Sequence, residues 1–161
     1  CSKGIIYSFE PIKENYELLL ANVQLNNLQQ VHIFNLAVSK YNIPIKLYIN
    51  DDDAGHSIFS QSSQNIMVDS ISLQKIFDDN KIEHCNFLKL DCEGAEYEII
   101  KNLPLAYFEK IDKMIIEYHM ADSHPELLSE LYEILYNHNF EIETNSSSLD
   151  MGIIYAKKTK L

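Results

Sequence analysis

Short apolar runs alternate with helical periods along the whole of this 161-residue sequence. The first run, residues 5–9, ends in Glu10-Pro11 and leads into residues 11–26, where apolar side chains recur at helical spacing. Such alternation predicts an α/β domain. The other expected strands are 31–38, 43–49, 66–72, 86–91, 113–119, 140–145 and 152–158, the last two forming an antiparallel pair, and the other expected helices are 72–80, 96–103 and 125–139.

Composition points to one globular domain spanning residues 1–161. Hydrophobic residues make up 46% and charged residues 23%, and there is no repeat or linker. No run approaches the roughly 18–20 apolar residues of a membrane span, and the start lacks the pattern of a signal peptide. The three cysteines, Cys1, Cys85 and Cys92, form no CxxC pair, which favours a reducing, cytoplasmic setting.

Charge and glycine content exclude several classes of partner. The formal net charge of −11 repels phosphate backbones, so nucleic acid is not an expected substrate. The four glycines are scattered, so neither a P-loop nor a GxGxxG dinucleotide fingerprint is present. The missing fingerprint weighs against a nucleotide-dependent oxidoreductase.

Polar residues follow several of the expected strands. In open α/β sheets, ligands bind outside the carboxyl ends of the parallel strands. Glu10 ends the first strand, where a carboxylate can accept hydrogen bonds from a ribose diol. The alternative is that Glu10 caps the following helix, whose N-terminus favours negative charge.

The stretch NFLKLDCEGAE, residues 86–96, places carboxylates at the tip of a buried strand. Lys89 and Asp91 point to the same face, and such a pair can orient a hydroxyl group and take its proton. The structural alternative is that Glu93 and Glu96 only begin the next helix, with Gly94 easing the turn.

A second polar group follows the strand 113–119. Glu117, His119, Asp122 and His124 lie close together in IIEYHMADSH, but their spacing matches no established zinc signature, so no metal site is expected. His119 is expected to act as a base or a substrate contact, because an imidazole titrates near neutral pH. A hydrogen-bonded structural histidine is the alternative.

Several motifs together resemble the FkbM-type S-adenosylmethionine-dependent methyltransferases. They are FEP at residues 9–11, AVS at 37–39, HSIF at 56–59, KLDCEGAE at 89–96 and EYH at 117–119. The resemblance extends over roughly residues 5–157, and its most specific part is the KxDxEGxE pattern. It implies a Rossmann-like class I methyltransferase fold, with helices on both faces of the sheet and an antiparallel last strand.

The resemblance also implies O-methyl transfer from S-adenosylmethionine to a hydroxyl group of a sugar or other small acceptor. Glu10 and Pro11 would lie at the cofactor ribose, and Ala37 and Val38 at the adenine edge. Asp91 would lie near the methyl group. The remaining site residues, around the acceptor or in a loop over it, would be Lys89, His119, Ser57, Glu93 and Glu117.

The sequence departs from the family pattern in two places. The family's SLD reads Ser72-Leu73-Gln74 here, without the acidic residue. The first strand and glycine-rich loop of the family have no counterpart in the 161 residues, which predicts two half-sheets with unpaired inner edges. Three explanations remain open: truncation, pairing of edges between subunits of a homo-oligomer, or a degenerate, non-catalytic interaction module.

Overall fold

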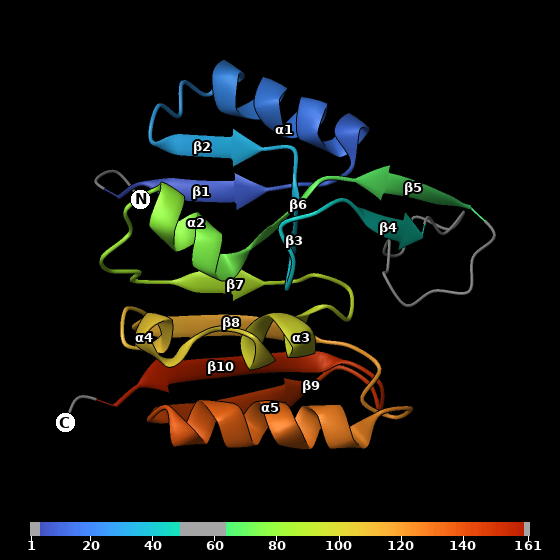
Figure 1. Cartoon of the computed structure of the whole chain (residues 1–161), viewed down its shortest axis with the longest axis vertical. Coiled ribbons are helices and arrows are strands. Elements are labelled where there is room, and N and C mark those ends of the chain that lie inside the picture. Colours follow the sequence, from blue (N-terminus) through green and yellow to red (C-terminus); the bar gives the residue numbers. More distant parts are fainter. Residues whose placement is uncertain (1–3, 49–63, 160–161) are drawn as a thin grey trace.

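The computed structural model describes residues 4–48 and 64–159, and its main strands form two separate groups. The first group is a parallel pair, β1 (Ile6–Phe9) and β2 (Val31–Phe34). The second is a four-stranded sheet in the order β7-β8-β10-β9. In Figure 1 the arrows of β1, β2 and β7 point the same way, so their carboxyl ends lie on one side of the molecule.

The four-stranded sheet carries most of the hydrophobic core. The strand β7 (Leu88–Leu90) runs parallel to β8 (Lys113–Tyr118), while β10 (Gly152–Lys158) is antiparallel to both β8 and β9 (Phe140–Ser146). The antiparallel end of the sheet was expected from the sequence and is confirmed. Alternate residues of β8 and β10 are buried, because side chains along a strand point to opposite faces.

Two helices cover one face of this sheet (Figure 1). They are α3 (Glu96–Lys101) and α5 (Pro125–Asn137), the latter starting with proline at its tolerated first turn. Leu131 and Leu135 of α5 are fully buried with Ile116 and Ile154 of the sheet. Each such side chain contributes roughly 1.5–3 kcal/mol of transfer free energy, so this half holds the larger share of the hydrophobic stabilisation. The short helix α4 (Leu105–Phe108) adds Phe108 to the same core.

Two segments expected as single strands are each divided in the structure. Residues 31–38 form β2 and then β3 (Ala37–Ser39), and residues 66–72 form the end of β5 (Asn65–Val68) and β6 (Ser70–Ser72). The chain leaves β2 at Asn35, whose side-chain amide donates to the carbonyls of Glu10 and Pro11 at 2.9 and 3.0 Å. After the break, β3 pairs with β6 in parallel, and β4 (Ile45–Tyr48) pairs with β5 in antiparallel orientation.

The other helices begin close to where the sequence predicted. The helix α1 (Lys13–Leu25) follows Pro11, and α2 (Leu73–Asp79) follows Ser72, whose hydroxyl accepts the Lys75 backbone N–H at 3.2 Å as an N-cap. None of the helices in the described part of the chain is long and apolar enough to cross a membrane.

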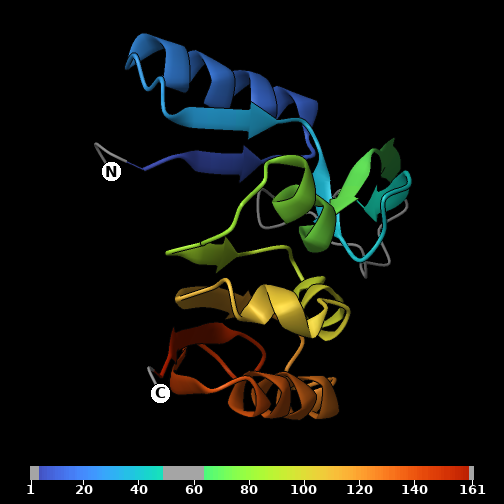
Figure 2. The same cartoon turned by 60° about the vertical axis from the view of Figure 1, so that its left-hand side comes forward.

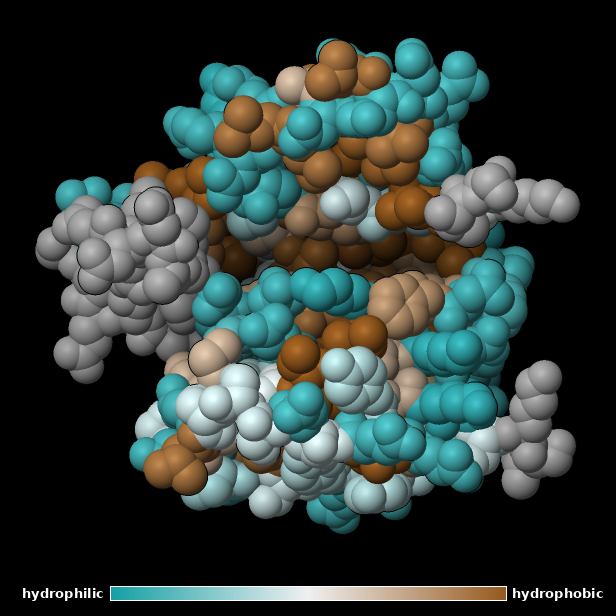
Figure 3. Space-filling view, turned by 180° about the vertical axis from the view of Figure 1, so that it is seen from behind, coloured by the Kyte–Doolittle hydropathy of each residue, from teal (hydrophilic) through white to brown (hydrophobic). Residues whose placement is uncertain are grey.

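The strands β1 and β7 face each other across a gap and are not hydrogen-bonded to one another. Figures 1 and 2 show the two groups of strands separated at this height, and Figure 3 shows a hollow with apolar side chains at the same level. Apolar side chains remain exposed close to both edges: Ile5 is 64% and Phe87 53% exposed. Among residues 4–48 and 64–159, the expectation of two half-sheets with unpaired inner edges is therefore confirmed.

Candidate functional site

The end of β7 presents a lysine and a carboxylate together. Lys89 Nζ lies 2.7 Å from Asp91 Oδ2, which confirms that the two side chains share a face of the strand. Both remain accessible, Lys89 more so than Asp91. A partly exposed carboxylate held by a neighbouring ammonium group can accept a hydrogen bond from a bound hydroxyl group.

The loop after Asp91 is folded around a buried carboxylate. Glu96 is 0% exposed, and its two oxygens accept the backbone N–H groups of Cys92 at 2.5 Å and Gly94 at 2.8 Å. The loop contains two left-handed residues, Glu93 with φ 52° and Gly94 with φ 104°. The expectation that Glu96 begins a helix is correct, since α3 starts there, but its side chain also turns back to hold the loop.

Sequence reasoning did not assign Glu96 to the site. One sequence feature could have pointed to Glu96: a carboxylate that follows a glycine closely at the start of a helix has the spacing of a capping interaction. Only the fold shows that this carboxylate also faces a histidine from another strand.

His119, just after β8, lies between two of these carboxylates. Its Nδ1 is 3.5 Å from Glu96 Oε1, and its Nε2 is 3.5 Å from Glu93 Oε2. Both separations are too long for good hydrogen bonds, and Nδ1 is buried without a hydrogen-bond partner among the described residues. The contacts are therefore electrostatic. The Tyr97 hydroxyl fixes the backbone by donating to the His119 carbonyl at 2.5 Å.

The surroundings of His119 and Glu93 shift the pKa values of both side chains. The carboxylate of Glu96, and next those of Glu93 and Glu117, raise the pKa of His119 above its ordinary value, while burial opposes the shift. Burial raises the pKa of Glu93, although the nearby His119 acts in the opposite direction. Burial favours the neutral form of each group, whereas the attraction between the two groups favours their charged forms.

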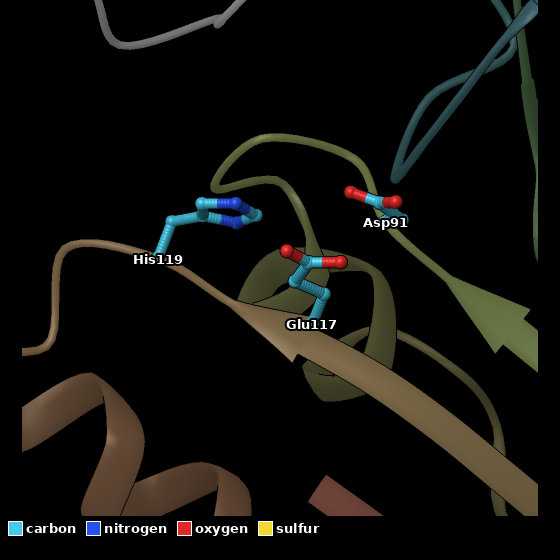
Figure 4. A group of neighbouring side chains, drawn as sticks. All are labelled: Asp91, Glu117 and His119. Carbon is cyan, nitrogen blue, oxygen red and sulfur yellow. The ribbon is translucent and has the colours of Figure 1, made fainter. Parts of the chain in front are cut away.

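Glu117 completes the cluster from the carboxyl end of β8. One ligand-type atom each from Asp91, Glu117 and His119 lies within 4.8 Å of the others, as Figure 4 illustrates. The structure thus brings together five residues that the sequence predicted for the site: Lys89, Asp91, Glu93, Glu117 and His119.

Two further polar residues from the same stretch point elsewhere. The backbone N–H of Asp122 donates to Asp150, and the His124 ring contacts Glu126 at the start of α5.

The predicted cofactor residues lie on the other half of the molecule. Glu10 Oε1 accepts the Ile12 backbone N–H at 2.8 Å just before α1, but the N-cap of this helix is Ile12 and no side-chain hydrogen bond caps it, so the helix-capping alternative is not realised. Ala37 and Val38 belong to β3 and not to the end of β2, since the expected single strand is interrupted between β2 and β3. Ser57 falls outside the described residues.

One surface depression lies away from this cluster. It lies on the face of β8, β10 and β9 that no described helix covers, and its lining includes Phe87, Ile115 and Tyr155 but none of the predicted site residues that the structure describes. We place the candidate site at the carboxylate cluster because the titratable groups converge there.

The overall fold is that of a known class of enzymes. Precorrin-6y C5,15-methyltransferase from Geobacter metallireducens GS-15 is structurally similar, with a TM-score of 0.53 and 13% sequence identity, covering 98% of this chain and 69% of that chain. At this identity the likeness shows the fold alone, the Rossmann-like α/β fold of methyltransferases.

The family model of the methyltransferase FkbM domain matches residues 2–142. The chain belongs to this family of methyltransferases, as its motifs predicted. A search of curated proteins gave no match.

Proposed function

We propose that this domain transfers a methyl group from S-adenosylmethionine to a hydroxyl oxygen of a small acceptor, such as a sugar or another natural-product scaffold. The observation that carries the proposal is the convergence of Lys89, Asp91 and His119 at the carboxyl ends of two neighbouring parallel strands. This is where open α/β sheets bind ligands. Family membership supplies the class of reaction.

The residues of the cluster have distinct roles in this reaction. The acceptor oxygen attacks the sulfonium methyl carbon in line, the carbon–sulfur bond breaks, and S-adenosylhomocysteine leaves. Asp91 accepts the hydroxyl proton as the oxygen forms its new bond, and Lys89 holds the carboxylate in place by donating to it. Positioning of the two reactants supplies much of the rate, because the displacement needs close and aligned atoms.

Charge favours the cofactor at this site. The carboxylates Asp91, Glu93 and Glu117 lie close enough to influence His119 and one another, and a sulfonium cation is attracted to such a region. On the other half-sheet, one oxygen of Glu10 accepts the Ile12 N–H just before α1, and its carboxylate would also accept the ribose hydroxyls. Ala37 and Val38 would line the adenine edge.

Calorimetric titration with S-adenosylmethionine and S-adenosylhomocysteine tests the proposal. We expect micromolar binding that weakens at least tenfold in Glu10→Gln, since loss of a charge-assisted hydrogen bond costs about 1.5–3 kcal/mol. Glutamine retains a carbonyl oxygen that can accept the Ile12 N–H, so this local contact is preserved. Glu14→Gln, in the first turn of the same helix, is the matched control and should bind as the parent chain does.

A non-catalytic module of the same fold is the second candidate, favoured by the unpaired inner edges of β1 and β7. Such edges pair readily with other strands. This candidate predicts self-association without cofactor binding, so sedimentation should be measured on the titrated samples. A chain extended by any residues encoded before Cys1 should be titrated in parallel. Absence of cofactor binding by both chains would refute methyl transfer, whereas binding by the longer chain alone would show that the site needs an added segment.

A further inference from the structure

We propose that Asp91, Glu117 and His119 bind one divalent cation. Their ligand-type atoms lie within 4.8 Å of one another, with Asp91 following β7 and the other two at the end of β8 (Figure 4). Three atoms within 4.8 Å of one another all lie within about 2.8 Å of a common point, while metal–ligand bonds are about 2.0–2.3 Å. The three side chains therefore need only a small closing movement to share an ion.

The charge around these residues favours a bound cation. Four carboxylates, those of Asp91, Glu93, Glu96 and Glu117, act on or lie beside His119, and Glu96 is fully buried. Lys89 is the ammonium group paired with Asp91. The carboxylates outnumber the cationic groups by two even when His119 is protonated. Uncompensated charge in a partly buried site is costly, and a divalent ion would offset it.

A carboxylate lies 3.5 Å from each ring nitrogen of His119. A metal-binding histidine binds the ion through one ring nitrogen and donates its other ring N–H to a carboxylate. Here Nδ1 is buried, has no hydrogen-bond partner among the described residues, and lies 3.5 Å from Glu96 Oε1. Glu96 is itself fixed by the N–H groups of Cys92 and Gly94. With an ion on Nε2, a small shift of the ring would let Nδ1–H donate to Glu96.

The ligand set indicates the class of ion. One imidazole and two carboxylates suit a first-row divalent ion such as Mn²⁺, since carboxylates favour Mn²⁺ and Mg²⁺ while imidazole favours the transition metals. Three protein ligands leave coordination positions open.

This inference rests on the proposed methyl transfer for the role of the ion. An acceptor hydroxyl bound to the ion would lose its proton more easily, because the ion polarises the O–H bond. With the ion bound, Asp91 would serve as its ligand, so Glu93 would take that proton in place of Asp91, and the oxygen would displace S-adenosylhomocysteine from the methyl group. The site therefore selects acceptors whose hydroxyl oxygen can coordinate a cation.

Titration of the chain with Mn²⁺, with free Mn²⁺ followed by electron paramagnetic resonance, tests the site. We expect one ion per chain, with at least tenfold weaker binding in Glu117→Gln and in Asp91→Asn. Lys89→Met should bind Mn²⁺ several-fold more tightly, because its ammonium group competes with the ion for Asp91. Glu133→Gln, at an exposed position of α5, is the matched control and should leave the affinity unchanged.

Circular dichroism of each variant shows whether it is folded. If Glu117→Gln does not fold, Asp91→Asn tests the site at a more exposed ligand. Absence of Mn²⁺ binding, or equal affinity in the parent, Glu117→Gln and Asp91→Asn chains, would overturn the site. If cofactor binding persists in that case, only the metal site is refuted. If Mn²⁺ binds with the expected variant effects, the site stands even where the cofactor titration refutes methyl transfer.

Discussion

Replacing Glu96 with glutamine should loosen the loop that carries the candidate site. Both Glu96 oxygens accept backbone N–H groups, from Cys92 at 2.5 Å and Gly94 at 2.8 Å, and the side chain is 0% exposed. A glutamine amide offers one acceptor oxygen, and its NH2 group would meet the other N–H donor. A hydrogen bond to a charged group contributes about 1.5–3 kcal/mol, so the free energy of unfolding should fall by about 2–3 kcal/mol.

Urea unfolding followed by circular dichroism measures this loss. With a slope of about 1–3 kcal/mol per molar urea, the midpoint should fall by roughly 0.7–3 M. Glu98→Gln is the matched control on the same helix. Glu98 pairs with Lys40, and both side chains are about one-third exposed, so solvent screens the pair. Its loss should cost less than about 1 kcal/mol.

Comparing the stability losses of the two variants distinguishes the loss of a buried hydrogen-bond acceptor from the loss of a solvent-screened ion pair. If Glu96→Gln unfolds within about 0.5 kcal/mol of the parent chain, or costs no more than Glu98→Gln, then Glu96 does not hold the loop. The proposed orientation of His119 by Glu96 would lose its basis in the same result.

Three further predictions concern packing and titration elsewhere in the chain. Gly152→Ala should lower the free energy of unfolding by about 1–3 kcal/mol in urea, because a Cβ there would lie 2.4 Å from the Tyr118 hydroxyl; an unchanged midpoint would contradict this packing. Burial, including its stacking on Phe108, lowers the pKa of His138 below 6.5, so the unfolded chain binds the proton more readily and stability should fall as pH drops below about that value. Thermal unfolding at pH 7.5 and 5.5 should show a smaller acid loss in His138→Gln than in the parent chain, and equal losses would refute the assignment. Burial raises the pKa of the Cys92 thiol to about 12, so a disulfide reagent at pH 8 should label it in urea but only slowly in the folded chain; equal rates would count against burial of the thiol.

The sequence by itself determined the elements whose patterns are local. Helical spacing and Pro125 predicted α5, and short apolar runs predicted β8 and β10, because the side chains that form these patterns lie a few residues apart. Family motifs predicted the residues of the site and the missing centre of the sheet. These features need no knowledge of distant contacts.

The tertiary structure decided where segments end and which side chains meet. The breaks after β2 and β5 were not predicted, and the first is tied to contacts between Asn35 and residues 24 or more positions away. Spacing gave no metal signature for His119, yet the parallel pairing of Leu90 with Ile116 brings Asp91 beside Glu117 and His119. Such proximity depends on strand register, which is fixed by packing of the whole sheet and cannot be read from local sequence patterns.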